Sequence, residues 1–401
     1  MKLRIFLVLI LIFTIAYAFF QKHASIVKTQ AEKNTPKAFL SEVYDKIKEN
    51  YWEKIEDEKL VEAFKSVSAS LGKKLPAEVK TKDELIKNLD YSKAATIAAQ
   101  VLASLPPVGR SGLFTEKQEQ QLKNTVNNVD PSKDLYKDLG VAKGASEAVV
   151  EQAFQKKQAE ASPEELKKIT YAKEVLTEKD TKERYDKGGI EPTIFTKIIG
   201  DTLYLQFKKF SPTSLDEFQK AFDAQRERPL DSLIFDLRGN IGGAIDSTAY
   251  FLGYFIGKNQ SAFEFYKKGD YLPFRTPTDK LPSIAKYKQI VVLVDNNTQS
   301  SAEMMAATFK KYHLGLVLGS STKGWGTVER VFPIDNQFDP ANKYSLFMVH
   351  SITLRDDNQP IEGRGVDPDI KLTDKNWNQQ LYSYFRNQDL INALKRVYST
   401  I

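Results

Sequence analysis

The sequence predicts an α/β core preceded by two helical regions, and three patterns along the chain support this. From residue 190 onward, apolar strand-like runs alternate with amphipathic helix-like runs, which is typical of an α/β core. Residues 36–128 instead place apolar side chains at three- and four-residue steps, which predicts helices. Residues 130–189 contain three further helix-like stretches and end at a Gly-Gly pair. The expected order is therefore an all-α region, a small helical domain and the α/β core.

The elements of the core are expected in this order. "TLYLQFKKF" (202–210) alternates as a strand, and "SLDEFQKAFDAQRE" (214–227) begins at a serine cap and reads as a helix. "DSLIFDLRGN" (231–240) and "KQIVVLVDNN" (288–297) are apolar strands, and "SAEMMAATFKKY" (301–312) is a helix. We expect the core to span 190–375 and a C-terminal helix to occupy 376–401.

The first 23 residues predict a signal peptide or a membrane anchor. Lys2 and Arg4 precede an apolar run from Ile5 to Phe20, which suits a signal-peptide core better than a full membrane span. The small residues "AYA" fit a cleavage site, but the run continues past them, which favours an uncleaved anchor equally. The positive charges before the run place the rest of the chain outside the cytoplasm. We therefore expect a secreted or membrane-anchored protein.

The composition excludes several classes of function. The chain of 401 residues has no cysteine, so thiolate chemistry and disulfides are excluded. Its three histidines have no zinc-hydrolase spacing, and a Ser-His-Asp triad would have to use His313 or His350. The net charge of +6 comes from lysines spread along helix-like stretches, so no nucleic-acid partner is expected. No cofactor-binding motif is present, and we expect no cofactor.

Two strand-to-helix turns of the core carry candidate chemistry. In "DLRGNIGGA", the glycines allow close approach of the backbone to a ligand or a reacting atom, and backbone N–H groups there suit an oxyanion. The alternative is an ordinary tight turn. In "VVLVDNNTQSSAEMMAA", Ser300 and Ser301 stand at a helix start, either as an N-cap or as a nucleophile beside N–H groups. A third stretch, "TKGWGT" (322–327), superficially suggests a phosphate loop. That loop needs a lysine directly after its second glycine, but Trp325 follows Gly324 here, so we discard this possibility.

Residues 130–189 resemble a J domain, the module with which co-chaperones engage a chaperone ATPase. The resemblance rests on "DLYKDLGVAKGASEAVVEQAFQKK" and "YAKEVLTEKDTKERYDKGG". A J domain works through His-Pro-Asp after its second helix, but here that loop reads "QAEASPEE" and the segment has no histidine. The resemblance therefore implies a docking or structural module with a protein partner rather than a working co-chaperone.

The four stretches DLRGNIGG, SSAE, TKGWGTVE and QPIEGRGVDPDI, in this order, resemble the C-terminal processing, or tail-specific, serine peptidases. The leading stretch "FLSEVYDKIKENYWE" resembles the family's N-terminal helices. The resemblance implies a ClpP/crotonase-like core, polypeptide substrates and a serine–lysine dyad, in which the lysine removes the serine proton. It also implies a PDZ module, but the J-like segment stands in that interval.

The family motif can be carried over residue by residue. It implies Ser300 as the nucleophile, with the N–H groups of Gly242 or Gly243 and of Ser301 as oxyanion donors. The family's lysine falls on Trp325, which has no basic nitrogen, and its supporting glutamine falls on Glu329.

Three functions stay open at this point: a serine peptidase with a replacement base, a non-catalytic scaffold and a co-chaperone. Lys323, two residues before Trp325, is the candidate replacement base, paired with Glu329. His313 or His350 is a further candidate for that role. The alternative to a peptidase is a non-catalytic scaffold that binds peptide segments. A co-chaperone is a third reading, opposed by the missing His-Pro-Asp and by the export signal.

Overall fold

The structure is a computed structural model and describes residues 33–399. The N-terminal segment predicted as a signal peptide or anchor lies outside these residues. None of the helices in residues 33–399 has the length and apolar character that crossing a membrane requires. The described chain forms two compact units, residues 33–119 with 329–350 and residues 120–328 with 351–399.

The first unit is mainly helical. Its helices are α2 (Pro36–Asn50), α3 (Asp57–Ser70), α4 (Lys82–Asn88), the 3-10 helix η1 (Tyr91–Lys93) and α5 (Ala94–Ser104). The start of α2 follows from the sequence, because Thr35 accepts a hydrogen bond from the N–H of Ala38 and a proline occupies the first turn. Phe39, Tyr44 and Phe64 are buried between these helices.

The expectation that residues 36–128 are all helical is wrong at one place. Strand β1 (Gly112–Thr115) pairs antiparallel with the start of β10 (Tyr344–Thr353), and β9 (Thr327–Pro333) pairs with β10 as well. The partner strand lies more than 200 residues further along the chain, so no local pattern reveals the pairing. Helix α6 (Glu116–Val126) follows β1.

A small helical module opens the second unit. It consists of α7 (Leu135–Leu139), α8 (Glu147–Gln158), α9 (Pro163–Thr177) and α10 (Lys179–Gly188), one helix more than the sequence predicted. A cluster that includes Tyr136, Phe154 and Leu176 forms its core. The ends of the module meet, because Val129 and Ile190 form an antiparallel bridge.

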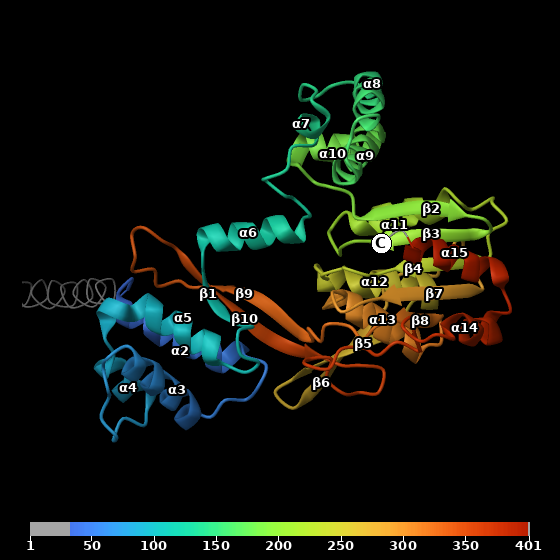
Figure 1. Cartoon of the computed structure of the whole chain (residues 1–401). Coiled ribbons are helices and arrows are strands. Elements are labelled where there is room, and N and C mark those ends of the chain that lie inside the picture. The colour runs from blue at the N-terminus through green and yellow to red at the C-terminus, as the bar shows by residue number, and fades with distance from the viewer. Residues whose placement is uncertain (1–32, 400–401) are drawn as a thin grey trace, which may run out of the picture. The chain divides into compact units, whose positions relative to one another are not determined.

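The α/β core predicted from residue 190 onward is confirmed. Its sheet has six strands in the order β11-β8-β7-β4-β3-β2, all parallel except the edge strand β2 (Figure 1). The strands are β2 (Ile194–Ile199), β3 (Thr202–Phe207), β4 (Ser232–Asp236), β7 (Gln289–Val294), β8 (Leu316–Gly319) and β11 (Ile370–Lys371). The strands β4 and β7 lie in the middle and are almost entirely apolar, as strands of a sheet covered on both faces usually are.

Helices cover both faces of this sheet. One face packs on α11 (Ser214–Asp223), α12 (Ile245–Ile256) and α13 (Ser301–Lys311), in a core rich in phenylalanine. The other face packs on α14 (Trp377–Phe385) and α15 (Gln388–Ser399). Strands β5 (Ser261–Lys267) and β6 (Asp270–Arg275) form a hairpin, and β5 pairs antiparallel with the end of β10.

The single C-terminal helix predicted for 376–401 is wrong in one respect, because two helices occupy the described part of this segment. Arg386 adopts a left-handed conformation with φ 49° and ends α14. The Asn387 side chain then accepts a hydrogen bond from the N–H of Leu390 and begins α15. Arginine is compatible with a helix, so residue type alone does not indicate this break. The backbone conformation of Arg386 sets it.

Candidate active site

Ser300 lies in the turn between the end of β7 and the start of α13. Its backbone has φ 57° and ψ −125°, a conformation that costs a non-glycine residue on the order of 1–3 kcal/mol. A serine on a strained turn from a buried strand to a helix presents its hydroxyl above the sheet, as a nucleophile does in many hydrolases. The Ser300 side chain is half-buried, whereas the next residue, Ser301, is fully buried.

The glycine-rich turn after β4 lies directly against Ser300. A Cβ atom on Gly242 would be 2.7 Å from the Cβ of Ser300 and 3.0 Å from the backbone nitrogen of Ser301. A Cβ atom on Gly243 would be 2.0 Å from the carbonyl oxygen of Phe210. Both glycines also have positive φ, 82° and 140°. The structure therefore brings together two of the stretches that the sequence singled out. The contact with Ser300 requires glycine at 242, and the contact with Phe210 requires glycine at 243.

Hydrogen bonds fix the two turns to one another. The N–H of Gln299 donates to the carbonyl oxygen of Asn240 at 2.9 Å, and the hydroxyl of Thr298 donates to that of Leu237 at 2.9 Å. The carboxylate of Asp295 accepts a bond from the N–H of Gly239 at 2.9 Å. These bonds hold the backbone beside Ser300 in place without any substrate.

Asn240, which sequence reasoning did not single out, decides which N–H groups face the site. It is fully buried, and its amide nitrogen donates to the carbonyl oxygen of Phe207 at 2.7 Å. Its amide oxygen accepts the N–H of Gly242 at 2.8 Å. The N–H groups of Gly243 and Ser301, by contrast, donate to no atom of residues 33–399. Of the two glycines considered as oxyanion donors, Gly243 is thus the one whose N–H is available.

Glu303, in the first turn of α13, is the second residue that sequence reasoning underrated. Its carboxylate is fully buried and accepts hydrogen bonds from four donors. These are the N–H of Ser300 at 2.8 Å, the N–H of Gly324 at 2.7 Å, the N–H of Trp325 at 2.8 Å and the hydroxyl of Thr322. One carboxylate thus joins the Ser300 turn to the turn at 322–327. The sequence contained the signal, a glutamate three residues after an N-cap serine.

The environment of Glu303 acts on its charge in two opposite directions. Burial in the core raises the pKa of the Glu303 carboxyl, whereas its four hydrogen bonds lower it, and the net direction is upward. All four hydrogen-bond donors are neutral groups, and these bonds favour the ionised form of the carboxyl.

The turn at residues 322–327 is enclosed on its other side by residues 361–366. A Cβ atom on Gly326 would lie 2.2 Å from the backbone nitrogen of Glu362, and one on Gly324 would lie 2.9 Å from that of Arg364. The N–H of Gly363 donates to the carbonyl oxygen of Gly324 at 2.9 Å. The two glycines of the turn thus allow two backbone segments to pack closely.

Trp325 stands beside the serine turn. Its backbone nitrogen and that of Ser300 both lie 2.8 Å from the same oxygen, Oε2 of Glu303. The Trp325 side chain is half-buried. Lys323 is exposed, although its N–H donates to the carbonyl oxygen of Thr298 at 2.9 Å in the serine turn. Glu329 lies half-buried on β9, in the other compact unit.

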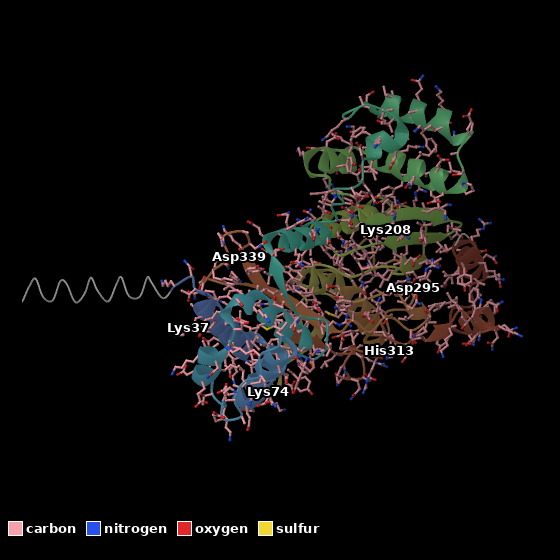
Figure 2. The ribbon with its side chains drawn as sticks, turned by 60° about the vertical axis from the view of Figure 1, so that its left-hand side comes forward. Lys37, Lys74, Lys208, Asp295, His313 and Asp339 are labelled. Carbon is pink, nitrogen blue, oxygen red and sulfur yellow. The ribbon has the colours of Figure 1, made fainter. Side chains whose placement is uncertain are left out.

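The structure argues against His313 as a replacement base. His313 follows the end of α13, whereas Ser300 precedes its start, so the helix separates them by roughly 18 Å at 1.5 Å per residue. Figure 2 labels His313 and Asp295, the residue that opens the serine turn, at separate places on the core. His350 lies on β10, in the other compact unit.

Comparisons with known proteins agree with this arrangement. Residues 201–372 match the model of peptidase family S41. The carboxy-terminal processing protease CtpA of Bacillus subtilis (strain 168) is 24% identical over 388 residues, which are 92% of this chain and 77% of that protein. A probable CtpA-like serine protease of Staphylococcus epidermidis is 26% identical over 196 residues, which are 49% of this chain and 38% of that protein.

One solved structure supports the fold. The photosystem II D1 C-terminal processing protease superposes with a TM-score of 0.54 at 13% identity, over 84% of this chain and 93% of that one. An identity this low shows a shared fold. The S41 match at 201–372 contains the Gly242 turn, the Ser300 turn and the turn at 322–327. Residues 201–372 are therefore similar to peptidase family S41, and these similarities support a serine-type peptidase.

Proposed function

We propose that the chain is a serine peptidase of the C-terminal processing type that acts on polypeptides outside the cytoplasm, with catalysis limited by Trp325. The observation that carries this proposal is the contact of Gly242 with Ser300, since it places a strained serine beside backbone N–H groups. The extracytoplasmic location rests on the charged and apolar N-terminal sequence alone.

The proposed reaction uses Ser300 as the nucleophile. Its Oγ attacks the carbonyl carbon of the peptide bond, and the N–H groups of Gly243 and Ser301 donate to the oxyanion that forms. The C–N bond then breaks, which leaves an acyl group on Ser300 and releases the amine with a proton. Water hydrolyses this ester and restores the serine. Asn240 and Glu303 act as positioning residues, because they fix the backbone of these donors.

The base is the weak point of the proposed mechanism. A base must remove the Ser300 proton, and the indole of Trp325 has no lone pair that serves. We propose Lys323 as the replacement, with Glu329 as its supporting group. A lysine base needs a poorly solvated site, whereas Lys323 is exposed. This role therefore requires that bound substrate cover Lys323, and the rate is expected to be low.

The second candidate function is a non-catalytic scaffold that binds peptide segments, and Trp325 favours it. A tryptophan beside the serine turn offers a large apolar contact to a bound peptide while providing no base. Both candidates use the same turns and differ only in whether a bond is cut.

One experiment separates the two candidates. The purified chain is incubated with an unfolded protein substrate, beside Ser300→Ala, Lys323→Ala and, as an exposed-lysine control, Lys375→Ala. Slow cleavage that is lost in the first two variants and kept in the control supports the peptidase with Lys323 as base. Cleavage lost only in Ser300→Ala rejects Lys323 as base. Absence of cleavage with substrate binding retained favours the scaffold.

For the helical module at 130–189 we propose a docking role with a protein partner. The loop between α8 and α9 begins at Ala159, and Ser162 caps α9 through a reciprocal hydrogen-bond pair with Glu165. This cap lies in the loop that the resemblance compares with the His-Pro-Asp loop of a J domain, which supports a role other than ATPase stimulation. The test is an ATPase assay with a chaperone ATPase of the kind that J domains engage, in which this proposal predicts no stimulation.

A further inference from the structure

A cavity of about 720 Å³ lies between the helical module, α6 and the core, and all of its lining residues belong to the second compact unit. Its volume is in the range of ligand-binding pockets. Its wall includes Asn124 of α6, Lys133 and Tyr171 of the module, and Lys208, Lys209 and Ile241 of the core. Gly239 and Ile241 belong to the same turn as Gly242, so the cavity adjoins the segment that contacts Ser300.

Two lysines on this wall have no anionic partner among residues 33–399. Lys208 and Lys209 follow the end of β3, and neither ammonium group forms an ion pair or hydrogen bond with a described residue. Lys208, labelled in Figure 2, instead lies over two aromatic rings, with Nζ 4.2 Å from the ring centre of Phe195 and 4.9 Å from that of Tyr171. Burial lowers the pKa of Lys209, which is half-buried, whereas Lys208 is exposed.

The other charges of the cavity are already paired. The Lys133 ammonium lies 3.2 Å from the carboxylate of Glu191, and the Tyr171 hydroxyl donates to the same carboxylate. Lys133 is thus paired, and Lys208 and Lys209 are the lysines of the wall that form no ion pair with residues 33–399, although the charge of Glu191 acts on both from a longer distance. Lys208 is exposed and Lys209 is half-buried, so both ammonium groups can donate charge-assisted hydrogen bonds to a carboxylate that enters the cavity.

We propose that this cavity binds a carboxylate group of an extended polypeptide through Lys208 and Lys209. The inference rests on the proposed function, because the bound chain would run along the Gly239–Gly243 turn toward Ser300. The wall suits a peptide: Gln121 and Asn124 supply amide groups to its backbone, and Ile241, 45% exposed, supplies an apolar contact. The carboxylate belongs either to the C-terminus of the polypeptide or to an acidic side chain, and both offer the same chemistry.

The test measures binding rather than cleavage, so it stands apart from the test of the peptidase. In the full chain carrying Ser300→Ala, fluorescence anisotropy measures the affinity of three short labelled peptides. They share one neutral sequence and end in a free carboxylate, in an amide, or in an amide with one internal glutamate. The same series is measured with Lys208→Met, with Lys209→Met and with the exposed-lysine control Lys375→Met, while circular dichroism checks folding.

At least one carboxylate peptide is expected to bind roughly tenfold more tightly than the neutral amide peptide, since one hydrogen bond to a charged group is lost in the latter. Each cavity variant is expected to remove this preference, and the control is expected to keep it. The source of the carboxylate is the end of the chain if only the free-acid peptide binds tightly, and an acidic side chain if the glutamate peptide does. Equal binding of all three peptides, or a preference that survives in both folded cavity variants, overturns the proposal. Cleavage plays no part in either outcome.

Discussion

The turn at Ser300 and the turn at residues 322–327 are held by the same carboxylate but differ in what they present. Glu303 accepts backbone N–H groups from both turns. The first turn presents a serine in a strained conformation beside two glycines. The second presents Trp325, at the position that the resemblance assigns to the family's lysine. The carboxylate of Glu303 accepts hydrogen bonds only from main-chain N–H groups and from the hydroxyl of Thr322. The backbone of the two turns is therefore held independently of the side chains that the turns present.

Removal of Glu303 is expected to affect both turns at once and to have the largest effect. Glu303→Ala leaves two buried and two partly buried donors without this acceptor, so the free energy of unfolding should fall by about 4 kcal/mol. Urea unfolding measures this. The matched control is the exposed Glu227→Ala, for which a change within about 0.5 kcal/mol is expected. Equal effects of the two substitutions would show that the turns do not depend on this carboxylate.

A lysine at position 325 tests whether the Ser300 turn supports catalysis once the turn at 322–327 supplies a base. Trp325→Lys is expected to raise the rate of peptide cleavage by about a hundredfold, the contribution of a positioned general base. Trp325→Ala is the control, because it removes the indole without adding a base. Steady-state kinetics on one peptide substrate compares the variants. Equal rates in both would mean that bulk, and not the missing base, limits the reaction.

The glycine contact can be isolated with a matched pair of substitutions. Gly242→Ala places a Cβ 2.7 Å from that of Ser300, whereas Gly200→Ala, in the turn between β2 and β3, meets no atom within 4 Å. Both positions have positive φ, 82° and 60°, so both substitutions carry the backbone cost of about 1 kcal/mol. Only Gly242→Ala should lose roughly 1–2 kcal/mol more and abolish cleavage. Thermal unfolding and the cleavage assay measure the two effects.

The smallest expected effect is a pH dependence that belongs to Glu303. Because burial raises its pKa in the folded state, the native protein binds this proton more readily than the unfolded chain does. The contribution of Glu303 to the free energy of unfolding therefore falls as pH rises from the ordinary value of 4.5 to the raised pKa, by at most about 1.4 kcal/mol per pH unit.

The measurement is the difference in unfolding free energy between the parent and Glu303→Gln across this pH range. Glutamine has the same shape and does not titrate, so it serves as the reference. A difference that grows with rising pH would mean that the four hydrogen bonds, and not burial, dominate the pKa.

The sequence was sufficient for the α/β core and for the main helices because their patterns are local. The starts of β4, β7 and α13 could each be located within one residue, whereas the predicted strands 231–240 and 288–297 extend four and three residues past the ends of β4 and β7. The strand β1 and the hairpin β5–β6 were not anticipated. The first depends on pairing with residues 344–347, and the second lies in a run of mixed aromatic and charged residues.

The candidate site could be predicted as stretches of sequence but not as contacts. Glycine at 242 and serine at 300 were expected near one another, yet only the structure shows that the N–H of Gly242 is engaged by Asn240. The role of Glu303 also escaped prediction, because three of its four partners are backbone groups and two of them lie more than 20 residues away. Side-chain identity does not encode which main-chain groups a carboxylate will reach.

The bridge between Val129 and Ile190 has a consequence for how this chain can change. The entry and exit of the helical module lie side by side, where the N–H of Glu191 donates to the carbonyl oxygen of Asn128 at 3.0 Å. A segment whose two ends already meet can be shortened, replaced or exchanged for another domain while the strands after it keep their register. The module can therefore be removed as a unit. Joining residue 129 directly to residue 190 would give a shorter chain in which the cavity beside Lys208 and Lys209 lacks the wall that the module provides.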